Sequence, residues 1–147
     1  MHDRRNMGDG EAMALALEHA EHARSQGGRP FGAVLAWPGG FAAAGDTKET
    51  AGDQTGHAVV NAIRKACQMR AGRRIRESVL YCVKEPCLMC AAAAASAGVR
   101  EIVYGVPDQD GFFTSGAYRG LPEALGLVGK LSPIAENTAA ASINGWA

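Results

Sequence analysis

Apolar residues are arranged along this chain in two ways, at helical spacing and in short continuous runs, which predict helices and strands. In residues 9–26 the apolar positions fall at i, i+3, i+4 and i+7 from Met13 to Ala20, so they share one face of a helix. Residues 31–37, in contrast, form a short and nearly continuous apolar run, Phe-Gly-Ala-Val-Leu-Ala-Trp, that is typical of a buried strand. The Pro-Gly-Gly turn at 38–40 predicts that the chain then reverses direction.

The pattern continues towards the C-terminus and sets the expected fold class. After the turn it predicts, in order, a strand at 41–44, a helix at 57–69, a strand at 78–84, a helix at 87–97, a strand at 100–105 and a short helix at 122–127. The polar segments 46–56 and 107–120 are expected loops, and no element is predicted for the tail that follows to Ala147. This order implies an α/β fold with a mixed sheet and helices on both faces. A right-handed crossover should make strands 78–84 and 100–105 parallel neighbours.

Composition places the chain among globular proteins and excludes several other classes. Of its 147 residues, 47% are apolar and 20% are charged, which is enough to build one core, so we expect a single domain over residues 1–147. Glycine and proline are scattered without a period, which excludes collagen-like and coiled-coil chains. No apolar run approaches the roughly 18 residues of a membrane-spanning helix, and the first residues lack the apolar stretch of a signal peptide. We therefore expect a cytoplasmic protein without a membrane partner.

Net charge gives no reason to expect a nucleic-acid-binding protein, although one segment is locally basic. Fifteen lysines and arginines balance fifteen acidic residues. Six basic and no acidic residues fall between Arg64 and Arg76, and such a run could contact phosphates. Because no aromatic residues are interleaved to stack on bases, we favour a solvated helix end and loop over an RNA-binding surface. RNA binding stays open as a weaker alternative.

The candidate chemistry lies in the cysteines. Cys87 and Cys90, in the segment Pro-Cys-Leu-Met-Cys, stand at i and i+3 and so share one face in the first turn of a predicted helix. The positive end of a helix dipole lowers the pKa of a thiol, which favours thiolates that bind metal. His57 begins another predicted helix thirty residues earlier. An imidazole and two thiolates are zinc ligands, and three protein ligands leave the fourth tetrahedral position to water, as in catalytic zinc sites.

A closed structural zinc site is the alternative. It would need a fourth protein ligand, for which Cys82 and Cys67 are the candidates. Cys82 falls in a strand that is expected to be buried on both faces, and Cys67 lies ten residues along the helix from His57 and off its face. Both are better explained as small apolar core residues. We therefore predict one Zn²⁺ per subunit, bound by His57, Cys87 and Cys90, with water as the fourth ligand.

These residues and their surroundings resemble a known superfamily. The segments are Pro-Phe-Gly-Ala-Val at 30–34, Thr-Gly-His-Ala at 55–58, Asn-Ala-Ile-Arg-Lys-Ala-Cys at 61–67 and Glu-Pro-Cys-Leu-Met-Cys-Ala at 85–91. They are similar to the zinc-dependent cytidine-deaminase-like superfamily, in particular to its guanine deaminase and tRNA adenosine deaminase branch; the superfamily signature is His-x-Glu followed by Pro-Cys-x-x-Cys. The resemblance implies a three-layer α/β/α sandwich, a homodimer or higher homo-oligomer, and hydrolytic release of ammonia from an amino-heterocycle.

Position 59 departs from that signature. The family carries a glutamate two residues after the zinc-binding histidine, whereas this chain has Val59. In the family that glutamate moves protons between the zinc-bound water, the ring and the departing amine. A valine carries no proton, and the loss of general acid–base catalysis costs about 10²–10⁴ in rate. We therefore expect the deaminase activity of this form to be impaired.

Three explanations of Val59 stay open on the sequence alone. In the first, the valine is an introduced or spontaneous change from glutamate, since the two codons differ by one base. In the second, it is natural in a non-catalytic homologue; the non-catalytic partner subunit of eukaryotic tRNA adenosine deaminase similarly has valine there. In the third, another carboxylate transfers the proton, and Asp46, Asp53 and Glu85 are near the motif along the chain. We favour the first two over the third.

The resemblance also marks candidate substrate-binding residues. The guanine and adenosine deaminases place an asparagine eleven residues before the zinc-binding histidine, where this chain has Asp46. An ionised aspartate only accepts hydrogen bonds, so Asp46 is expected to favour a substrate edge that presents N–H groups, although a turn-capping role explains it equally well. Phe31 resembles a family position that lines the base pocket, and Glu85 directly precedes the Pro-Cys-x-x-Cys motif. We expect groups at and near Phe31, Asp46 and Glu85 to hold the ring.

Two classes of function follow. The first is a zinc-dependent hydrolytic deaminase that acts on a nucleobase, a nucleoside or a related amino-heterocycle. The second is a catalytically inactive zinc-binding partner or ligand-binding homologue, in which binding of zinc and ligand persists without turnover. We favour a free small molecule over tRNA as the substrate, because the net charge is zero and the basic run is short.

Overall fold

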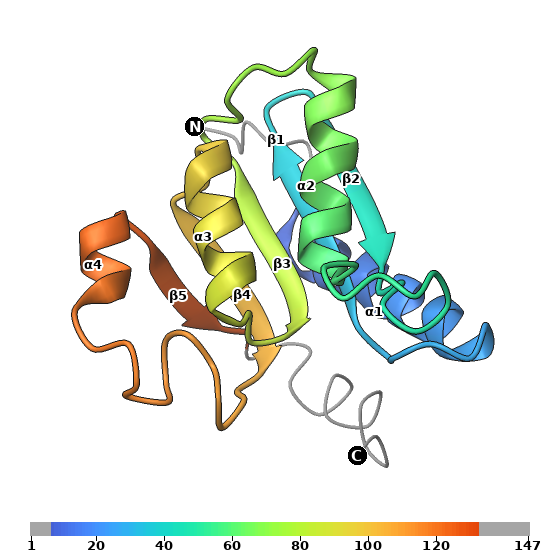
Figure 1. The fold of residues 1–147 in the computed structure, drawn as a ribbon. Helices are drawn as coiled ribbons and strands as arrows, with labels where there is room; N and C mark the ends of the chain where they lie inside the picture. The colour runs from blue at the N-terminus through green and yellow to red at the C-terminus, as the bar shows by residue number, and fades with distance from the viewer. Residues whose placement is uncertain (1–6, 133–147) are drawn as a thin grey trace.

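The helices and strands follow one another in the order that the sequence predicts, with one further strand at the end (Figure 1). The computed structural model describes residues 7–132. Its elements are α1 (Asp9–Ser25), β1 (Gly32–Trp37), β2 (Gly40–Gly45), α2 (Ala58–Met69), β3 (Val79–Lys84), α3 (Leu88–Ala97), β4 (Glu101–Val106), α4 (Leu121–Leu125) and β5 (Val128–Leu131). Each predicted element is present, with its ends shifted by at most two residues. None of the helices in this part of the chain is both long and apolar enough to cross a membrane.

The five strands form one mixed sheet in the order β2-β1-β3-β4-β5. Strand β1 is antiparallel to both β2 and β3, whereas β3, β4 and β5 run parallel to one another. The predicted parallel pairing of β3 with β4 is confirmed, with Leu80 opposite Ile102. Helix α3 forms the crossover between these two strands, so its N-terminus follows directly from the end of β3.

Helices cover both faces of the sheet, which confirms the predicted α/β/α sandwich (Figure 1). Helix α1 packs against β1, β2 and β3 on one face, and α2 and α3 lie side by side on the other. The side chains of β1 alternate between two cores: Ala33 and Leu35 pack beneath α2 and α3, and Val34 and Ala36 pack against α1. Because both faces of β1 are buried, its sequence is continuously apolar rather than alternating.

Small residues let α1 approach the sheet closely. The buried face of this helix consists of alanines and one methionine, and Ala12, Ala16 and Ala20 are completely buried. Gly32, at the start of β1, lies against the helix: a Cβ there would overlap the carbonyl oxygen of Ala16 and come within 2.7 Å of the amide nitrogen of Ala20. The glycine of the Phe-Gly-Ala-Val segment therefore sets the distance between α1 and β1.

The sequence pattern does not predict β5, which pairs in parallel with β4 at the edge of the sheet. Its four residues, Val-Gly-Lys-Leu, contain no continuous apolar run, and Val128 and Leu131 are exposed. The strand forms because the backbone groups of β4 are available for pairing. The pairing begins with the amide of Val128, which donates to the carbonyl of Arg100 at 2.8 Å. The rest of the tail, residues 133–147, lies outside the described part of the chain.

We predict that Gly32→Ala lowers the free energy of unfolding by about 3 kcal/mol or more. The added methyl group meets backbone atoms of α1, which cannot move aside as the end of a flexible side chain would. Chemical denaturation followed by circular dichroism measures the change. Gly8→Ala is the control, since a Cβ there meets nothing within 4 Å, and its effect should stay below about 1 kcal/mol. Equal effects of the two substitutions would show that the packing of α1 does not need Gly32.

Candidate metal centre

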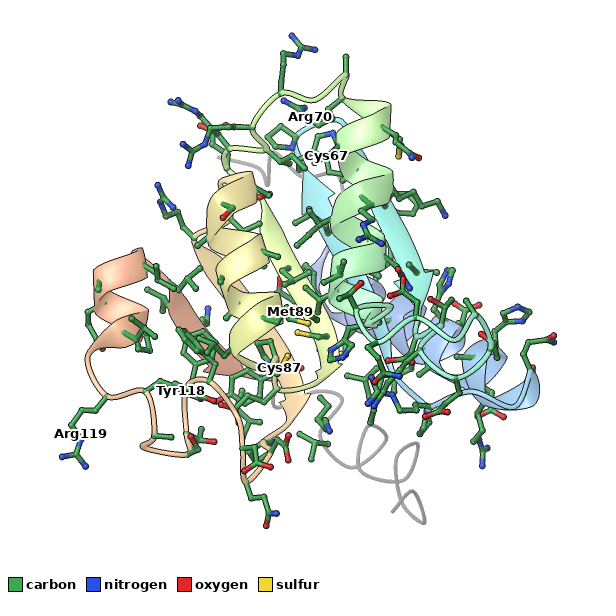
Figure 2. The ribbon with its side chains drawn as sticks, in the orientation of Figure 1. Cys67, Arg70, Cys87, Met89, Tyr118 and Arg119 are labelled. Atoms are coloured by element: carbon green, nitrogen blue, oxygen red, sulfur yellow. The ribbon has the colours of Figure 1, made fainter. Side chains whose placement is uncertain are left out.

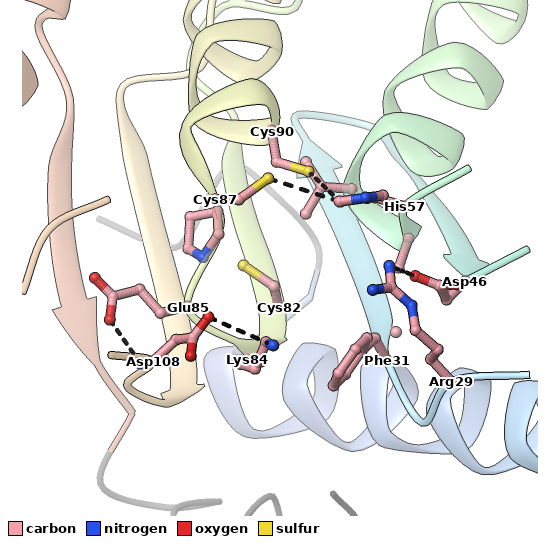
Figure 3. Close-up of a pocket in the computed structure, with 14 residues that line it drawn as sticks. Arg29, Phe31, Asp46, His57, Cys82, Lys84, Glu85, Cys87, Cys90 and Asp108 are labelled. Atoms are coloured by element: carbon pink, nitrogen blue, oxygen red, sulfur yellow. Dashed lines mark hydrogen bonds and ion pairs between the residues drawn. The ribbon is translucent and has the colours of Figure 1, made fainter. Parts of the chain in front are cut away.

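The N-termini of α2 and α3 meet at one end of the sheet and bring the three predicted zinc ligands together (Figure 3). His57 is the N-cap residue of α2, and Cys87 is the N-cap residue of α3. Cys90 follows in the first turn of α3 and is buried. Sequence spacing alone gives the two cysteines a common face. The packing of the two helices against each other adds the histidine, which lies thirty residues away along the chain.

The distances among the three side chains suit tetrahedral zinc. The Nδ1 atom of His57 lies 3.7 Å from the Sγ atom of Cys87 and 3.4 Å from that of Cys90. Zinc–sulfur bonds of about 2.3 Å and a zinc–nitrogen bond of about 2.05 Å, meeting at a tetrahedral angle, require an N···S separation of about 3.6 Å. All three ligand atoms lie within 4.8 Å of one another. These residues could therefore bind one zinc ion through an imidazole nitrogen and two thiolates.

Their surroundings shift the pKa values of the two thiols in opposite directions. A hydrogen bond from Cys90 lowers the pKa of Cys87 to about 5 despite its partial burial, and the nearby His57 acts in the same direction. The pKa of Cys90 is raised, because its thiol is the donor in that hydrogen bond and because it is buried. Both thiols would bind a zinc ion as thiolates, so zinc binding would release the proton of Cys90.

Neither of the other two cysteines joins the three ligands in the part of the chain that the structure describes. The thiol of Cys82, in β3, lies 3.9 Å from the carbonyl oxygen of Val103, and burial raises its pKa, so it stays protonated. Cys67 lies about 15 Å along α2 from His57, at the opposite end of the helix layer from Cys87 (Figure 2), and packs against the core. Among residues 7–132, the arrangement therefore offers three candidate ligands and no fourth.

A pocket lies beside the three ligands, and Val59 forms part of its wall. Val59 is in the first turn of α2, two residues after His57, and is only 5% exposed. It also belongs to the hydrophobic core cluster beneath α2 and α3. A longer acidic side chain at position 59 could therefore extend toward the ligands. In this chain the pocket wall at position 59 is the aliphatic side chain of Val59.

Asp46, Phe31 and Glu85 line the same pocket, and each has partners within the protein. The carboxylate of Asp46 accepts a hydrogen bond at 2.6 Å from Nη2 of Arg29 and another at 3.0 Å from the backbone amide of Lys48. The second of these is the turn-capping contact expected of an aspartate in a loop. The first is a buried ion pair. That Asp46 also contacts a substrate stays a prediction.

Phe31 is contacted by two cationic side chains (Figure 3). The guanidinium carbon of Arg29 lies 5.1 Å from the centre of the ring, and Nζ of Lys84 lies 4.4 Å from it. Lys84 is in turn 3.5 Å from the carboxylate of Asp108. Cation–π contacts of this kind orient the positive groups. Phe31 thus supports two cations in the pocket wall, and its contact with a substrate ring stays a prediction.

Glu85 organises the loop that follows β4. Its buried carboxylate accepts hydrogen bonds from the backbone amides of Asp108, Phe113 and Thr114 and from the Thr114 hydroxyl, at 2.6–3.0 Å. A Cβ at Gly111 would overlap this carboxylate, so the loop wraps tightly around it. Because the proline and the first cysteine of the metal motif follow directly in sequence, this interaction also ties the loop to the ligand segment. Contact between Glu85 and a substrate stays a prediction.

Sequence reasoning does not single out Arg29, Lys84 or Asp108, although all three line the pocket. Their contacts join segments that are distant along the chain, and no periodicity reports such contacts. Position is the one usable signal. Arg29 lies just before β1, and Lys84 is the last residue of β3. Because these two strands are antiparallel, both residues lie at the same end of the sheet, where the cysteine motif begins.

Zinc content tests the ligand set. We predict one zinc ion per chain, measured by inductively coupled plasma mass spectrometry on protein expressed with zinc in the medium. Cys87→Ser and Cys90→Ser should each abolish stoichiometric zinc, because each removes one of three protein ligands. Cys67→Ser is the control and should keep its zinc. Loss of zinc from Cys67→Ser or Cys82→Ser would instead indicate a closed four-ligand site.

Substitution of Glu85 tests the organisation of the loop. We predict that Glu85→Gln lowers the free energy of unfolding by about 2–4 kcal/mol, because the new amide group would face the backbone donors of Phe113 and Thr114. Hydrogen exchange followed by mass spectrometry should become faster across residues 108–114.

Glu101→Gln is the matched control for Glu85→Gln. Its carboxylate makes an exposed ion pair with Lys130, and such pairs contribute at most about 1 kcal/mol. If hydrogen exchange across residues 108–114 is as slow in Glu85→Gln as in Glu101→Gln, Glu85 does not organise the loop.

Comparison with known proteins agrees with this geometry. Residues 7–106 match the family model of the cytidine and deoxycytidylate deaminase zinc-binding region. Over 100 residues the chain is 39% identical to a tRNA-specific adenosine deaminase of Agrobacterium fabrum, a match that spans 67% of this chain and 66% of that protein. Over 84 residues it is 38% identical to a guanine deaminase of Bacillus subtilis, spanning 56% of this chain and 54% of that protein. The chain thus covers less than two thirds of either relative.

A solved structure shares the fold over nearly its whole length. It comes from a study of A-to-I editing by tRNA:A34 deaminases, and it superposes with a TM-score of 0.79 and 33% sequence identity over 89% of this chain and 97% of that one. The family model covers more than half of the chain and includes His57, Cys87 and Cys90. The chain therefore belongs to the family of the cytidine and deoxycytidylate deaminase zinc-binding region.

Proposed function

We propose that this chain is a zinc-dependent hydrolytic deaminase that releases ammonia from a nucleobase, a nucleoside or a related amino-heterocycle, and that Val59 impairs it in the present form. The observation that carries the proposal is the open site of His57, Cys87 and Cys90 beside a pocket. The relatives, a tRNA-specific adenosine deaminase and a guanine deaminase, support the reaction class.

His57, Cys87 and Cys90 would hold the zinc ion, which when bound supplies a position for water and lowers the pKa of that water toward about 7. The chain's own part is then to hold the ring beside this position and to move protons. Residues of the pocket wall would hold the ring. Position 59 has no group that could move protons, because the isopropyl group of Val59 neither accepts nor donates a proton.

The three carboxylates that the sequence offers as substitutes support impairment rather than a new proton carrier. Asp46 holds Arg29 and caps a turn, and Glu85 accepts four hydrogen bonds from the loop after β4. Asp53 accepts hydrogen bonds from the amide and hydroxyl of Thr55, which lower its pKa, and it does not line the pocket. A general base must reach the proton that it removes, and none of the three is placed to do so freely.

The second candidate is a catalytically inactive zinc-binding partner or ligand-binding homologue. The packing of Val59 favours it, since this side chain belongs to the hydrophobic core cluster and is almost fully buried. A valine that fits its surroundings in this way suits a protein that binds zinc and a ring without converting the ring.

A free small molecule is the proposed substrate, a homodimer or higher homo-oligomer the proposed assembly, and the cytoplasm the proposed location. The basic segment 64–76 gives little support for RNA binding at this site, because it continues beyond the end of α2 that is remote from the zinc ligands (Figure 2). Within it, Arg70 lies 5.7 Å over the ring of Trp37, and Arg64 lies 4.0 Å from Asp53. The first contact holds Arg70 against the protein, and the second is an exposed ion pair.

Restoring the acid at position 59 tests the proposal. In Val59→Glu a carboxylate stands two residues after His57, so the rate of ammonia release should rise by about 10²–10⁴ for at least one substrate. An enzyme-coupled ammonia assay with a panel of aminopurines, aminopyrimidines and their nucleosides measures it. Val59→Gln is the matched control, because glutamine has the shape of glutamate but cannot exchange the proton.

The outcomes separate the three explanations of Val59. Turnover in Val59→Glu alone would mean a deaminase disabled at one position, and the active compound would identify the substrate. If the zinc-loaded, folded Val59→Glu chain releases no ammonia, the result would contradict the proposal and favour the inactive homologue. Turnover by the unmodified chain would show that another group moves the proton. Zinc content is measured in every variant, because a carboxylate beside the metal also changes metal affinity.

A further inference from the structure

A buried ion pair in the pocket wall determines which polar atoms a bound ring would meet. The side chains of Arg29 and Asp46 are 15% and 1% exposed, and Nη2 of Arg29 lies 2.6 Å from Oδ2 of Asp46. The other carboxylate oxygen, Oδ1, accepts the backbone amide of Lys48 at 3.0 Å. Both oxygens of Asp46 are therefore engaged within the protein, and the carboxylate acts as an anchor for the guanidinium.

The guanidinium of Arg29 makes one hydrogen bond among the described residues, and it offers donors only. It carries five N–H groups on three nitrogens, and its hydrogen bond to Asp46 involves Nη2 alone. Nε is buried without a hydrogen-bond partner. The contact with the Phe31 ring, at 5.1 Å, restrains the group from a second side. Arg29 lines the pocket together with the metal ligands, and Figure 3 shows its guanidinium beside Asp46 and Phe31.

We propose that Arg29, held in place by Asp46, is the residue that recognises the bound ring, and that it selects an amino-heterocycle with a carbonyl oxygen on the ring. This inference rests on the proposed function of the site. An asparagine side chain would offer a ring both a donor and an acceptor, whereas the Arg29–Asp46 pair offers donors. A ring carbonyl satisfies such a donor. A ring without one leaves the donor desolvated and unpaired, which lowers affinity.

The charge of the pocket wall favours a neutral ring over an anionic ligand. The positive charge of Arg29 is compensated by Asp46, and that of Lys84 by Asp108 at 3.5 Å. Glu85 adds a negative charge, which N–H and O–H dipoles stabilise. These five side chains leave no excess positive charge to attract a carboxylate or a phosphate. Hydrogen-bond polarity, rather than net charge, is then what distinguishes one ring from another.

Two matched ligand pairs test the role of Arg29. Guanine and 2-aminopurine differ by one ring carbonyl and the ring N–H beside it, as do cytosine and 4-aminopyrimidine. The zinc-loaded chain with Val59 is suited to isothermal titration calorimetry, because it should bind these rings without consuming them. We expect the carbonyl-bearing member of at least one pair to bind about tenfold to a hundredfold more tightly, which is the ratio that one charge-assisted hydrogen bond provides.

Substitutions in the Arg29–Asp46 ion pair test whether Arg29 causes this difference in affinity. Arg29→Met combined with Asp46→Asn keeps the net charge and leaves no buried charge unpaired, and it should abolish the ratio. Arg29→Lys keeps a positive donor beside Asp46 and should retain part of the ratio. The exposed pair of Arg24 and Glu21 offers the matched control: Arg24→Met combined with Glu21→Gln should leave the ratio unchanged.

The outcomes distinguish a wrong residue from a wrong function. Equal affinity for both members of each ligand pair, or a ratio that survives Arg29→Met with Asp46→Asn, would overturn the role of Arg29 and leave the deaminase proposal standing. Failure of all four rings, and of the nucleosides of guanine and cytosine, to bind the zinc-loaded chain would overturn the proposed function, and this inference with it. Zinc content and thermal unfolding of each variant establish that a lost ratio does not reflect a lost fold.

Discussion

The site depends on the packing of α2 against α3, which brings two helix N-termini to the same end of the sheet. The parallel crossover from β3 to β4 fixes the place of α3, and β1 and β2 support α2 beside it. The histidine and the two cysteines then lie at N···S separations of 3.4 and 3.7 Å, close to the value that tetrahedral zinc requires. Only two of the three ligands are neighbours in sequence, so the fold itself completes the metal site.

Around this centre the fold uses buried carboxylates as structural anchors. Asp46 holds a guanidinium in the pocket wall, and Glu85 holds the loop after β4, and both are about 2% exposed. Each satisfies several N–H donors, which is how a buried charge is tolerated. The position from which an acid could move protons is instead occupied by Val59. The described residues thus bring three candidate zinc ligands together beside a pocket whose wall is aliphatic at position 59.

Much of the fold and of the metal site can be predicted from the sequence, because both give local signals. Periodicity locates the elements of residues 7–132 except β5, which is stabilised by hydrogen bonds to β4 rather than by apolar burial. The sequence also predicts the three candidate zinc ligands, which the structure brings together. The anchors of the pocket give no such signal: Arg29 and Asp46 are 17 residues apart, and Glu85 reaches Phe113 across 28 residues. These contacts exist only once the strands have paired.

Zinc K-edge X-ray absorption spectroscopy of the zinc-loaded chain tests the open three-ligand site most directly. We predict a four-coordinate zinc with two sulfur neighbours at about 2.3 Å and two nitrogen or oxygen neighbours at about 2.0–2.1 Å. The sulfur neighbours would be Cys87 and Cys90, and His57 would be one of the lighter pair. A shell with three or four sulfur atoms would contradict this prediction, because a further cysteine would then close the site and leave no position for water.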